Sequence, residues 1–450
     1  MVYLPNSIIF EEKQKMNDRF GTYFSKKIHL FLFYIIFAFS ASSQEISTSS
    51  KFSFGKKNKA TKIVYNDSIG YGFDFNTINQ VILLKDSFTA NSPVYFSIRL
   101  PEGNYQIELV LGSKKTASKT TVKSESRRLM LTDIVIAKND EITKIITVNL
   151  RGSKINETTN IYLKDRELDD LNWDNKLTLE FLGTPAIKSI KITPIDQITT
   201  LFLAGDSTVT DQDLEPWASW GQYITSYFNS NVVIANYAYS GASLSSFKGG
   251  KRLEKILSLL KKGDYLLVEF GHNDEKQHGE GDGPWLNYTD LLSEFVTKTR
   301  EKGGIPVLIT PTQRRFFNTD GTLKPTHGDY PNAMRAVAKK LNVPLIDLTK
   351  MTTTLYESWG DIISRKAFVQ YPAHTFPGQN EKLEDNTHFN SFGANEIALC
   401  IINGIKENHL DAAKNLAPNI PDYTPDEPNQ FFKWNLPMSN RFETKKPDGN

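Results

Sequence analysis

The spacing of hydrophobic residues divides the chain into two regions that differ in secondary structure. From about residue 50 to residue 196, β-branched and aromatic residues form short runs separated by turn signals, with almost no helical periodicity. We expect strands at 94–100, 105–111, 142–150, 177–182 and 187–195. Many short strands without helices predict an all-β sandwich, which we assign to residues 44–196.

From residue 199 onward, short apolar runs alternate with amphipathic segments. Strands are expected at 200–204, 232–238, 265–270, 305–310 and 343–346, and helices at 217–228, 252–262, 288–302, 330–341 and 392–405. Such alternation predicts a parallel sheet covered by helices on both faces. We therefore expect an α/β fold, a three-layer α/β/α domain over residues 197–410. Residues 411–450 hold several prolines and no clear period, and are expected to run over the domain surface as an extension.

Residues 1–43 have the pattern of a secretory signal peptide. Two lysines precede an apolar run at 30–39, and small residues follow it. The run is about half the ~20 residues that span a bilayer, so we expect no stable membrane anchor after cleavage near Ser43-Gln44. The mature chain is thus expected to be exported, periplasmic or secreted. Whether Met1 or Met16 is the start is left open.

Charge and cysteine content exclude several classes of protein. The chain has 53 basic and 51 acidic residues, and the net charge of +2 lies entirely in residues 1–43. A formally neutral mature chain does not favour a nucleic-acid partner. A single cysteine, Cys400, excludes an internal disulfide framework and a multi-cysteine metal site. No histidine spacing matches a metal-binding motif, so a metal is not expected.

Two short motifs contain the residue types of a serine hydrolase. Gly205-Asp206-Ser207-Thr208 directly follows an expected strand, at the carboxyl end where open α/β sheets bind ligands. Asp385-Asn386-Thr387-His388 precedes the last long helix, and one compact loop could place the His388 base beside the Asp385 carboxylate. Taken alone, each motif could instead be a capping segment at the start of a helix.

Two further segments could supply hydrogen-bond donors for an oxyanion. Gly241 follows the second expected strand of this region, and Asn273 follows the third. A backbone N–H group at Gly241 and the side-chain amide of Asn273 would suit acyl transfer, where donors stabilise the developing negative charge. Singly, each segment is an ordinary turn.

The four segments in this order resemble the SGNH (GDSL-like) hydrolase family. The form Gly-Asp-Ser-Thr, the pair Arg314-Arg315 and the run at 385–389 are similar to its rhamnogalacturonan acetylesterase branch. The preceding β-rich region resembles a galactose-binding-like module. The branch often has a larger polar residue, frequently arginine, where this chain has Ala242. This difference bears on how the substrate is contacted and not on the type of reaction.

The resemblance implies a role for each matching residue. Ser207 would be the nucleophile, His388 the general base and then acid, and Asp385 the group that orients His388. The backbone N–H groups of Ser207 and Gly241, with the Asn273 side chain, would form the oxyanion hole. No metal or cofactor is implied.

Candidate substrate contacts are less specific. Trp217, Trp220 and Trp285 could stack on sugar rings, although such residues are often part of a core. Arg314 and Arg315 could hold uronate carboxylates, or could simply be a solvated pair.

These features lead to one hypothesis and two alternatives. We expect an exported carbohydrate esterase that removes O-acetyl groups from an acetylated polysaccharide or oligosaccharide, rhamnogalacturonan- or pectin-like, through an acyl-enzyme on Ser207. The alternatives are a lipase- or thioesterase-type hydrolase of the same superfamily, and a non-catalytic protein that binds glycan through its β-domain. The polysaccharide, the acetylated hydroxyl, the role of the β-domain and the oligomeric state stay open.

Overall fold

The computed structural model describes residues 49–56, 62–418 and 420–449. The expected signal peptide at 1–43 and its cleavage site lie outside the described residues. Within the described part of the chain, no helix is both long enough and apolar enough to span a bilayer.

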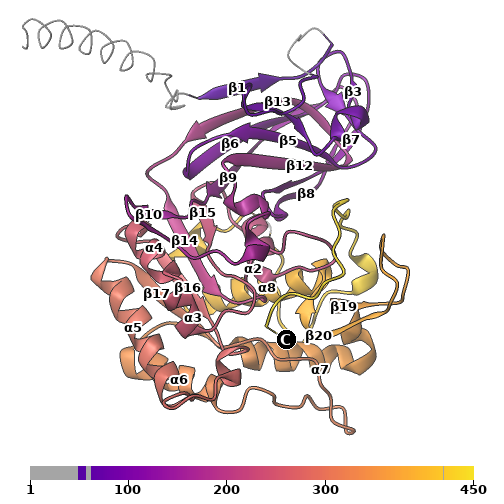
Figure 1. The fold of residues 1–450 in the computed structure, drawn as a ribbon. Helices are drawn as coiled ribbons and strands as arrows, with labels where there is room; N and C mark the ends of the chain where they lie inside the picture. The colour runs from indigo at the N-terminus through magenta and orange to yellow at the C-terminus, as the bar shows by residue number, and fades with distance from the viewer. Residues whose placement is uncertain (1–48, 57–61, 419, 450) are drawn as a thin grey trace, which may run out of the picture. The chain divides into compact units, whose positions relative to one another are not determined.

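The first region folds as an antiparallel β-sandwich (Figure 1). One sheet has the order β3-β4-β13-β6-β9, with β1 also paired to β13, and the other has the order β2-β5-β12-β7-β8. Aromatic rings fill the space between the sheets, where Phe73 and Phe88 meet edge to face with centroids 5.3 Å apart. The strands are β1 Ser50–Ser53, β2 Tyr71–Asp74, β3 Ile82–Leu83, β4 Phe88–Thr89, β5 Val94–Arg99, β6 Gly103–Gly112, β7 Ser118–Ser124, β8 Arg128–Ile136, β9 Glu141–Leu150, β12 Lys176–Thr184 and β13 Ala186–Pro194.

A parallel sheet with the order β15-β14-β16-β17-β18 forms the second region. Its strands are β14 Thr199–Gly205, β15 Val232–Asn236, β16 Tyr265–Glu269, β17 Ile305–Ile309 and β18 Leu345–Ile346. The long helices are α3 Leu244–Gly249, α4 Arg252–Leu259, α5 Asn287–Glu301, α6 Tyr330–Leu341, α7 Leu348–Ser364 and α8 Ser391–Glu407. The link between β13 and β14 contains the position where we expected the domain boundary.

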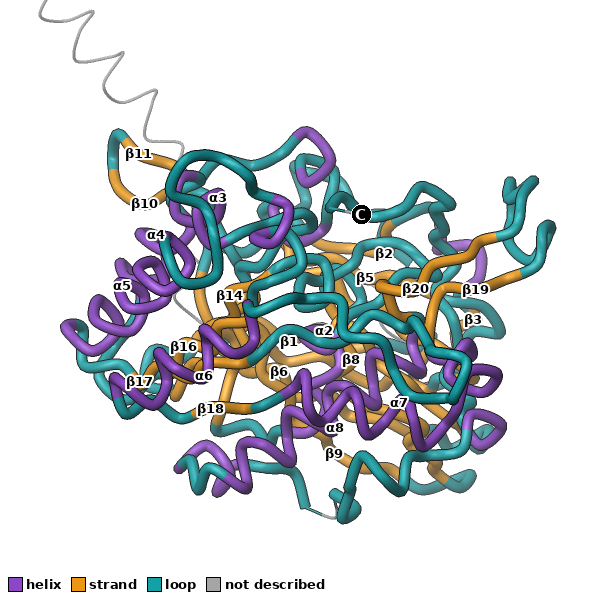
Figure 2. The backbone as a smooth tube through the Cα atoms, turned by 90° about the horizontal axis from the view of Figure 1, so that it is seen from below, coloured by secondary structure: helices purple, strands orange, loops and turns teal. Residues whose placement is uncertain are grey.

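Both faces of the parallel sheet are covered, as the alternation of strands and helices predicts (Figure 2). Along β14, Phe202 and Ala204 pack with α3 to α6, whereas Leu201 and Leu203 pack with α7 and α8. Side chains of a strand point alternately to the two faces, and both sets are apolar because neither face meets water. The α/β fold and the preceding β-sandwich are thus confirmed.

Several elements differ from the sequence-based expectation. The helix expected at 217–228 is the single turn α2, Trp220–Tyr223, continued as a 3-10 turn to Tyr227. Helix α7 was not predicted, because its threonines interrupt the helical spacing of its apolar residues. The segment 385–388 lies within strand β20, Leu383–Phe389, which pairs with β19, Phe368–Tyr371, so the expected loop is a strand.

Buried ion pairs join the sandwich to the segment that follows Ser207. Arg128 Nε lies 2.8 Å and Arg151 Nη2 lies 2.9 Å from Asp211 Oδ2, and Arg127 Nη2 lies 2.7 Å from Glu215 Oε2. All five side chains are almost wholly inaccessible to solvent. Because a buried charge without a partner is strongly destabilising, these pairs fix the segment 211–215 against the sandwich.

The turn between β7 and β8, which contains Arg127, holds one further acid. Glu125 is buried there, and its Oε1 accepts a hydrogen bond of 2.9 Å from the Thr178 N–H. Burial raises the pKa of Glu125 to about 8, against the opposing positive charge of Arg128. Glu125 therefore keeps its proton at neutral pH in the folded chain.

Replacing Arg128 with alanine should lower the free energy of unfolding by about 3 kcal/mol, since Asp211 then stays buried with one partner fewer. Urea denaturation followed by tryptophan fluorescence measures this loss. The matched control is Arg99→Ala, which removes an exposed pair with Asp67 and should cost less than about 1 kcal/mol. Similar small losses in both variants would contradict a structural role for the buried pairs.

Glu125→Gln should make stability less dependent on pH. In the native chain the folded state holds a proton between about pH 4.5 and 8 that the unfolded state releases. Stability therefore falls by about 1.4 kcal/mol per pH unit as pH rises through this window. Thermal unfolding at several pH values should show the variant gaining stability over the native chain with rising pH. Glu157→Gln, at an exposed position, is the control, and parallel curves for native chain and Glu125→Gln would refute the shifted pKa.

Candidate active site

Sheet topology brings together three of the segments singled out in the sequence. Strands β15, β14 and β16 are neighbours and parallel, so their carboxyl ends meet at one edge. Ser207 follows β14, Gly241 follows β15 and Asn273 follows β16. The fourth segment, in β20, is placed beside them by an antiparallel bridge between Ala218 and Phe389.

A continuous chain of hydrogen bonds joins Ser207, His388 and Asp385. Ser207 Oγ lies 2.9 Å from His388 Nε2, and His388 Nδ1 lies 2.8 Å from Asp385 Oδ2. The other carboxylate oxygen, Asp385 Oδ1, accepts the N–H groups of Thr387 at 2.7 Å and His388 at 2.8 Å. A carboxylate held at both oxygens fixes the tautomer and the orientation of the ring, leaving Nε2 free to accept a proton from Ser207.

The environment keeps the Asp385 carboxylate ionised. Burial alone would raise the pKa of Asp385, but the interactions with the His388 side chain and the backbone N–H groups of His388 and Thr387 outweigh it and hold that pKa well below its usual range. Trp217 meets the His388 ring edge to face, with centroids 5.7 Å apart. Trp217 therefore packs against the base rather than standing free for a sugar.

The expected oxyanion donors follow strands β14, β15 and β16, and Asn273 reaches the residue after Gly241. Within the described residues, neither Ser207 nor Gly241 uses its backbone N–H in a hydrogen bond. Gly241 has a φ of 78°, a conformation that side-chain-bearing residues adopt only with strain. Asn273 Nδ2 donates to the Ala242 carbonyl at 3.0 Å, which orients the side-chain amide toward the turn that contains Gly241.

One expected substrate contact, Trp220, lies beneath the site. Its side chain is wholly buried, and its Nε1 donates to Glu269 Oε2 at 2.5 Å, so the structure leaves it no surface for stacking. Glu269 also accepts from the Thr208 hydroxyl at 3.2 Å and the Thr312 N–H at 3.1 Å. Burial, and then the nearby charge of Asp206, raise the pKa of Glu269 above its usual range. Sequence reasoning missed this acid, although a lone glutamate ending an apolar strand was a visible signal.

Arg314 and Arg315 are both committed to acidic partners of the chain. Arg314 Nη2 lies 2.5 Å from Glu275 Oε1, and the Arg315 guanidinium pairs with Asp361. Arg315 also donates from Nε to Asn386 Oδ1 at 2.9 Å, bracing the strand that carries Asp385 and His388. The structure thus gives these arginines positioning contacts instead of the free uronate-binding surface we considered.

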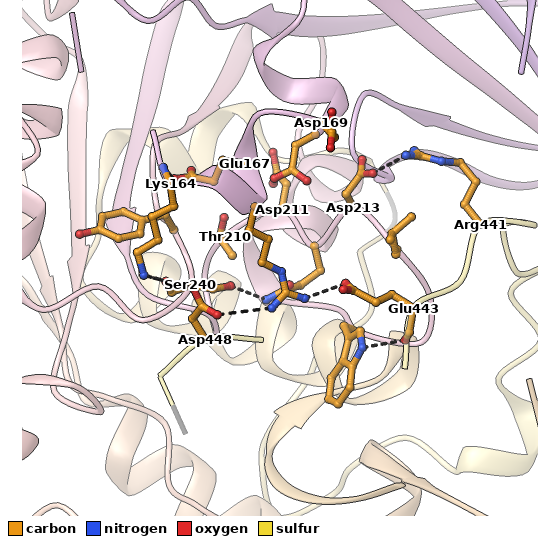
Figure 3. Close-up of a pocket in the computed structure, with 16 residues that line it drawn as sticks. Lys164, Glu167, Asp169, Thr210, Asp211, Asp213, Ser240, Arg441, Glu443 and Asp448 are labelled. Atoms are coloured by element: carbon orange, nitrogen blue, oxygen red, sulfur yellow. Dashed lines mark hydrogen bonds and ion pairs between the residues drawn. The ribbon is translucent and has the colours of Figure 1, made fainter. Parts of the chain in front are cut away.

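A pocket of about 280 Å³ lies along the segment that follows Ser207, with Thr210, Asp211 and Asp213 in its lining (Figure 3). Its lining combines the link after β11 (Thr159–Asn160), the segment 210–217 and the tail segment 441–448. Carboxylates dominate it, among them Asp169, Asp170 and Asp213. The pocket is therefore polar and charged. Among the described residues, no cluster of histidine, cysteine, aspartate or glutamate has the arrangement of a metal site.

Comparison with known proteins agrees with this geometry. The model of the GDSL-like Lipase/Acylhydrolase family matches residues 203–394. Over 209 residues, 46% of this chain and 89% of the relative, the sequence is 43% identical to the rhamnogalacturonan acetylesterase RhgT of Bacillus subtilis (strain 168). It is 33% identical over 219 residues, 48% of this chain, to the probable rhamnogalacturonan acetylesterase YesY of the same organism, covering 96% of that relative.

A solved structure, that of the YxiM protein of Bacillus subtilis, aligns with 81% of this chain and 100% of its own length at 20% identity and a TM-score of 0.44. Family membership rests on the sequence matches to the catalytic region. The chain belongs to the GDSL-like lipase/acylhydrolase family, as an acylhydrolase homologous to the rhamnogalacturonan acetylesterases.

Proposed function

We propose that the protein is an exported carbohydrate esterase that removes O-acetyl groups from a rhamnogalacturonan- or pectin-like polysaccharide. One observation carries the proposal: the hydrogen-bonded chain Ser207–His388–Asp385 in a sequence 43% identical to a rhamnogalacturonan acetylesterase. The relatives' substrates motivate the choice of polysaccharide, and the leader pattern motivates export.

Each residue of the candidate site has a defined role in the proposed reaction. His388 Nε2 takes the proton of Ser207 as Oγ attacks the acetyl carbonyl carbon, forming a tetrahedral intermediate. The N–H groups of Ser207 and Gly241 and the Asn273 amide stabilise its oxyanion. His388 then returns the proton to the sugar oxygen, which leaves as a hydroxyl. Water, activated by His388, hydrolyses the acetyl-enzyme and releases acetate.

The lining of the neighbouring pocket supports a sugar substrate over a lipid. A long acyl chain needs an apolar channel, whereas this pocket is lined by Asp169, Asp213 and other charged groups. Carboxyl groups suit sugar hydroxyls as hydrogen-bond acceptors. The lipase or thioesterase alternative is therefore less well supported, and the intact chain of hydrogen bonds opposes a purely glycan-binding role.

Ser207→Ala and His388→Ala should each lower kcat on a small aryl acetate by about 10⁴-fold or more, because members of such a triad act as a unit. Acetate release from acetylated rhamnogalacturonan should fall in parallel. The matched control is Ser293→Ala on α5, whose hydroxyl donates only to its own helix at Thr289.

Full activity in Ser207→Ala would overturn the mechanism. The substrate class is tested separately with the native chain, by comparing acetate release from acetylated rhamnogalacturonan, pectin and xylan with turnover of long-chain acyl esters. Faster turnover of the long-chain esters would favour a lipase-type hydrolase, and glycan binding without any esterase activity would favour a binding protein.

A further inference from the structure

The tail of the chain crosses the catalytic centre. Its last anchored residue is Glu443, whose N–H donates to the Glu215 carbonyl at 2.8 Å and whose carbonyl accepts from Trp217 Nε1 at 3.0 Å. Beyond it, residues 445–449, here named the strap, pass over the edge where Ser207 lies. Figure 3 shows Glu443 and Asp448 of this tail at the wall of the pocket.

The strap ends against the groups that would bind the acyl oxygen. A Cβ placed on Gly449 would lie 2.7 Å from Gly241 Cα and 2.6 Å from Asn273 Oδ1. Lys446 Nζ lies 3.3 Å from Asp385 Oδ2, the oxygen that also holds His388. The strap therefore occupies the space in front of Gly241 and Asn273 that an acetyl carbonyl must enter.

The low exposure of Ser207 and His388 also indicates that the site is covered. Ser207 is 3% and His388 1% exposed, so a sugar polymer has almost no surface of either residue to reach. Any acetyl ester must bring its carbonyl to Ser207, and a polysaccharide must bring a bulky alcohol there as well. Access by such a polymer requires the strap to move.

The strap is held by contacts that can be exchanged for water. Arg166 donates to the Lys446 carbonyl at 2.8 Å and lies 3.6 Å from Asp448, and the Gly449 carbonyl accepts from Lys276. Exposed or half-exposed pairs of this kind contribute at most about 1 kcal/mol each. By contrast, Ser439, just before the anchor, is fully buried and donates to Glu180 at 2.7 Å. The chain is thus fixed as far as Glu443 and weakly held beyond it.

One contact of the strap resembles the contact that an acidic sugar would make. The Asp448 carboxylate lies 3.3 Å from Lys164 Nζ, and the same ammonium donates to the Ser240 carbonyl at 2.9 Å, directly before Gly241 (Figure 3). A Cβ on Gly241 would lie 3.1 Å from Lys164 Nζ. A carboxylate is therefore held by a cation immediately beside the oxyanion donors. In an acetylated polyuronide, a carboxylate and an acetyl ester are likewise carried by the same or neighbouring sugars.

We propose that the strap occupies the substrate site as an internal inhibitor, with Asp448 in the place of a uronate carboxylate that Lys164 binds once the strap leaves. This inference rests on the proposed function for its choice of substrate, but the displacement of the strap does not depend on it. It assigns Arg166 to holding the strap and Lys164 to recognising acidic sugar units.

A chain shortened after Thr444, which keeps the Glu443 anchor, tests the strap directly. Its kcat/KM for a small aryl acetate should rise about fivefold or more, the equivalent of roughly 1 kcal/mol of strap binding. Arg166→Ala and Asp448→Asn in the full chain should raise it as well, since each loosens the strap without shortening the chain. Equal or lower kcat/KM in all three would overturn the inhibitory role. Lys248→Ala, an exposed lysine paired with Glu294, is the control.

Lys164→Ala in the shortened chain tests the substrate role. The ratio of kcat/KM on acetylated rhamnogalacturonan to that on neutral acetylated xylan should fall about tenfold, as expected for loss of one charge-assisted hydrogen bond. Lys248→Ala should leave this ratio unaltered. An unchanged ratio in Lys164→Ala would overturn the assignment of Lys164.

The test of the strap is independent of the proposed function, whereas the test of Lys164 requires that the chain deacetylates a polysaccharide. If no polysaccharide releases acetate with the native or the shortened chain, the proposed substrate is wrong, whereas the aryl acetate measurement still decides whether the strap inhibits.

Discussion

The position of the nucleophile depends on buried charges that belong to the other domain. Arg127, Arg128 and Arg151 of the sandwich neutralise Asp211 and Glu215, which lie in the segment after Ser207. None of these groups could be buried without its partner, so the two domains stabilise each other. The sandwich is therefore part of the framework that holds the segment after Ser207.

Two successive hydrogen bonds connect the sandwich to the backbone of Ser207. Arg127 Nη1 donates to the Gln212 carbonyl at 3.0 Å, and Gln212 Nε2 donates to the Ser207 carbonyl at 2.8 Å. The backbone of Ser207 is thus held from the sandwich side, while its hydroxyl is held by His388. Catalysis by positioned groups needs both, because a nucleophile must be aligned with its base and with the oxyanion donors together.

The grouping of the candidate site residues could be predicted from sequence because their placement follows local rules. Ser207, Gly241 and Asn273 each follow a strand of one parallel sheet, and strand ends of such a sheet share an edge. Asp385 and His388 are three residues apart, close enough for the carboxylate to reach the ring even though the segment is a strand and not the expected loop.

The remaining features depend on partners that sequence position does not reveal. Trp220 is buried because Glu269 provides an internal acceptor for its N–H group, and Arg315 is occupied because Asp361 comes near it in the fold. Similarly, Arg166 holds the tail near the candidate site through contacts with residues 277 and 280 positions later in the chain. No periodicity or motif in the sequence indicates this pairing. Such long-range electrostatic contacts decide which candidate residues remain available to a substrate.

The most direct measurement for the central claim is the identification of the acyl-enzyme. The native chain is mixed with an activated acetyl ester and quenched in acid within one turnover. It is then digested, and the masses of its peptides are measured by mass spectrometry. The proposed mechanism requires one acetyl group on the peptide that contains Ser207, and none on that peptide in Ser207→Ala. Turnover of the ester with the acetyl group on another residue, or with no acetyl-enzyme under conditions where deacylation is slow, would contradict it.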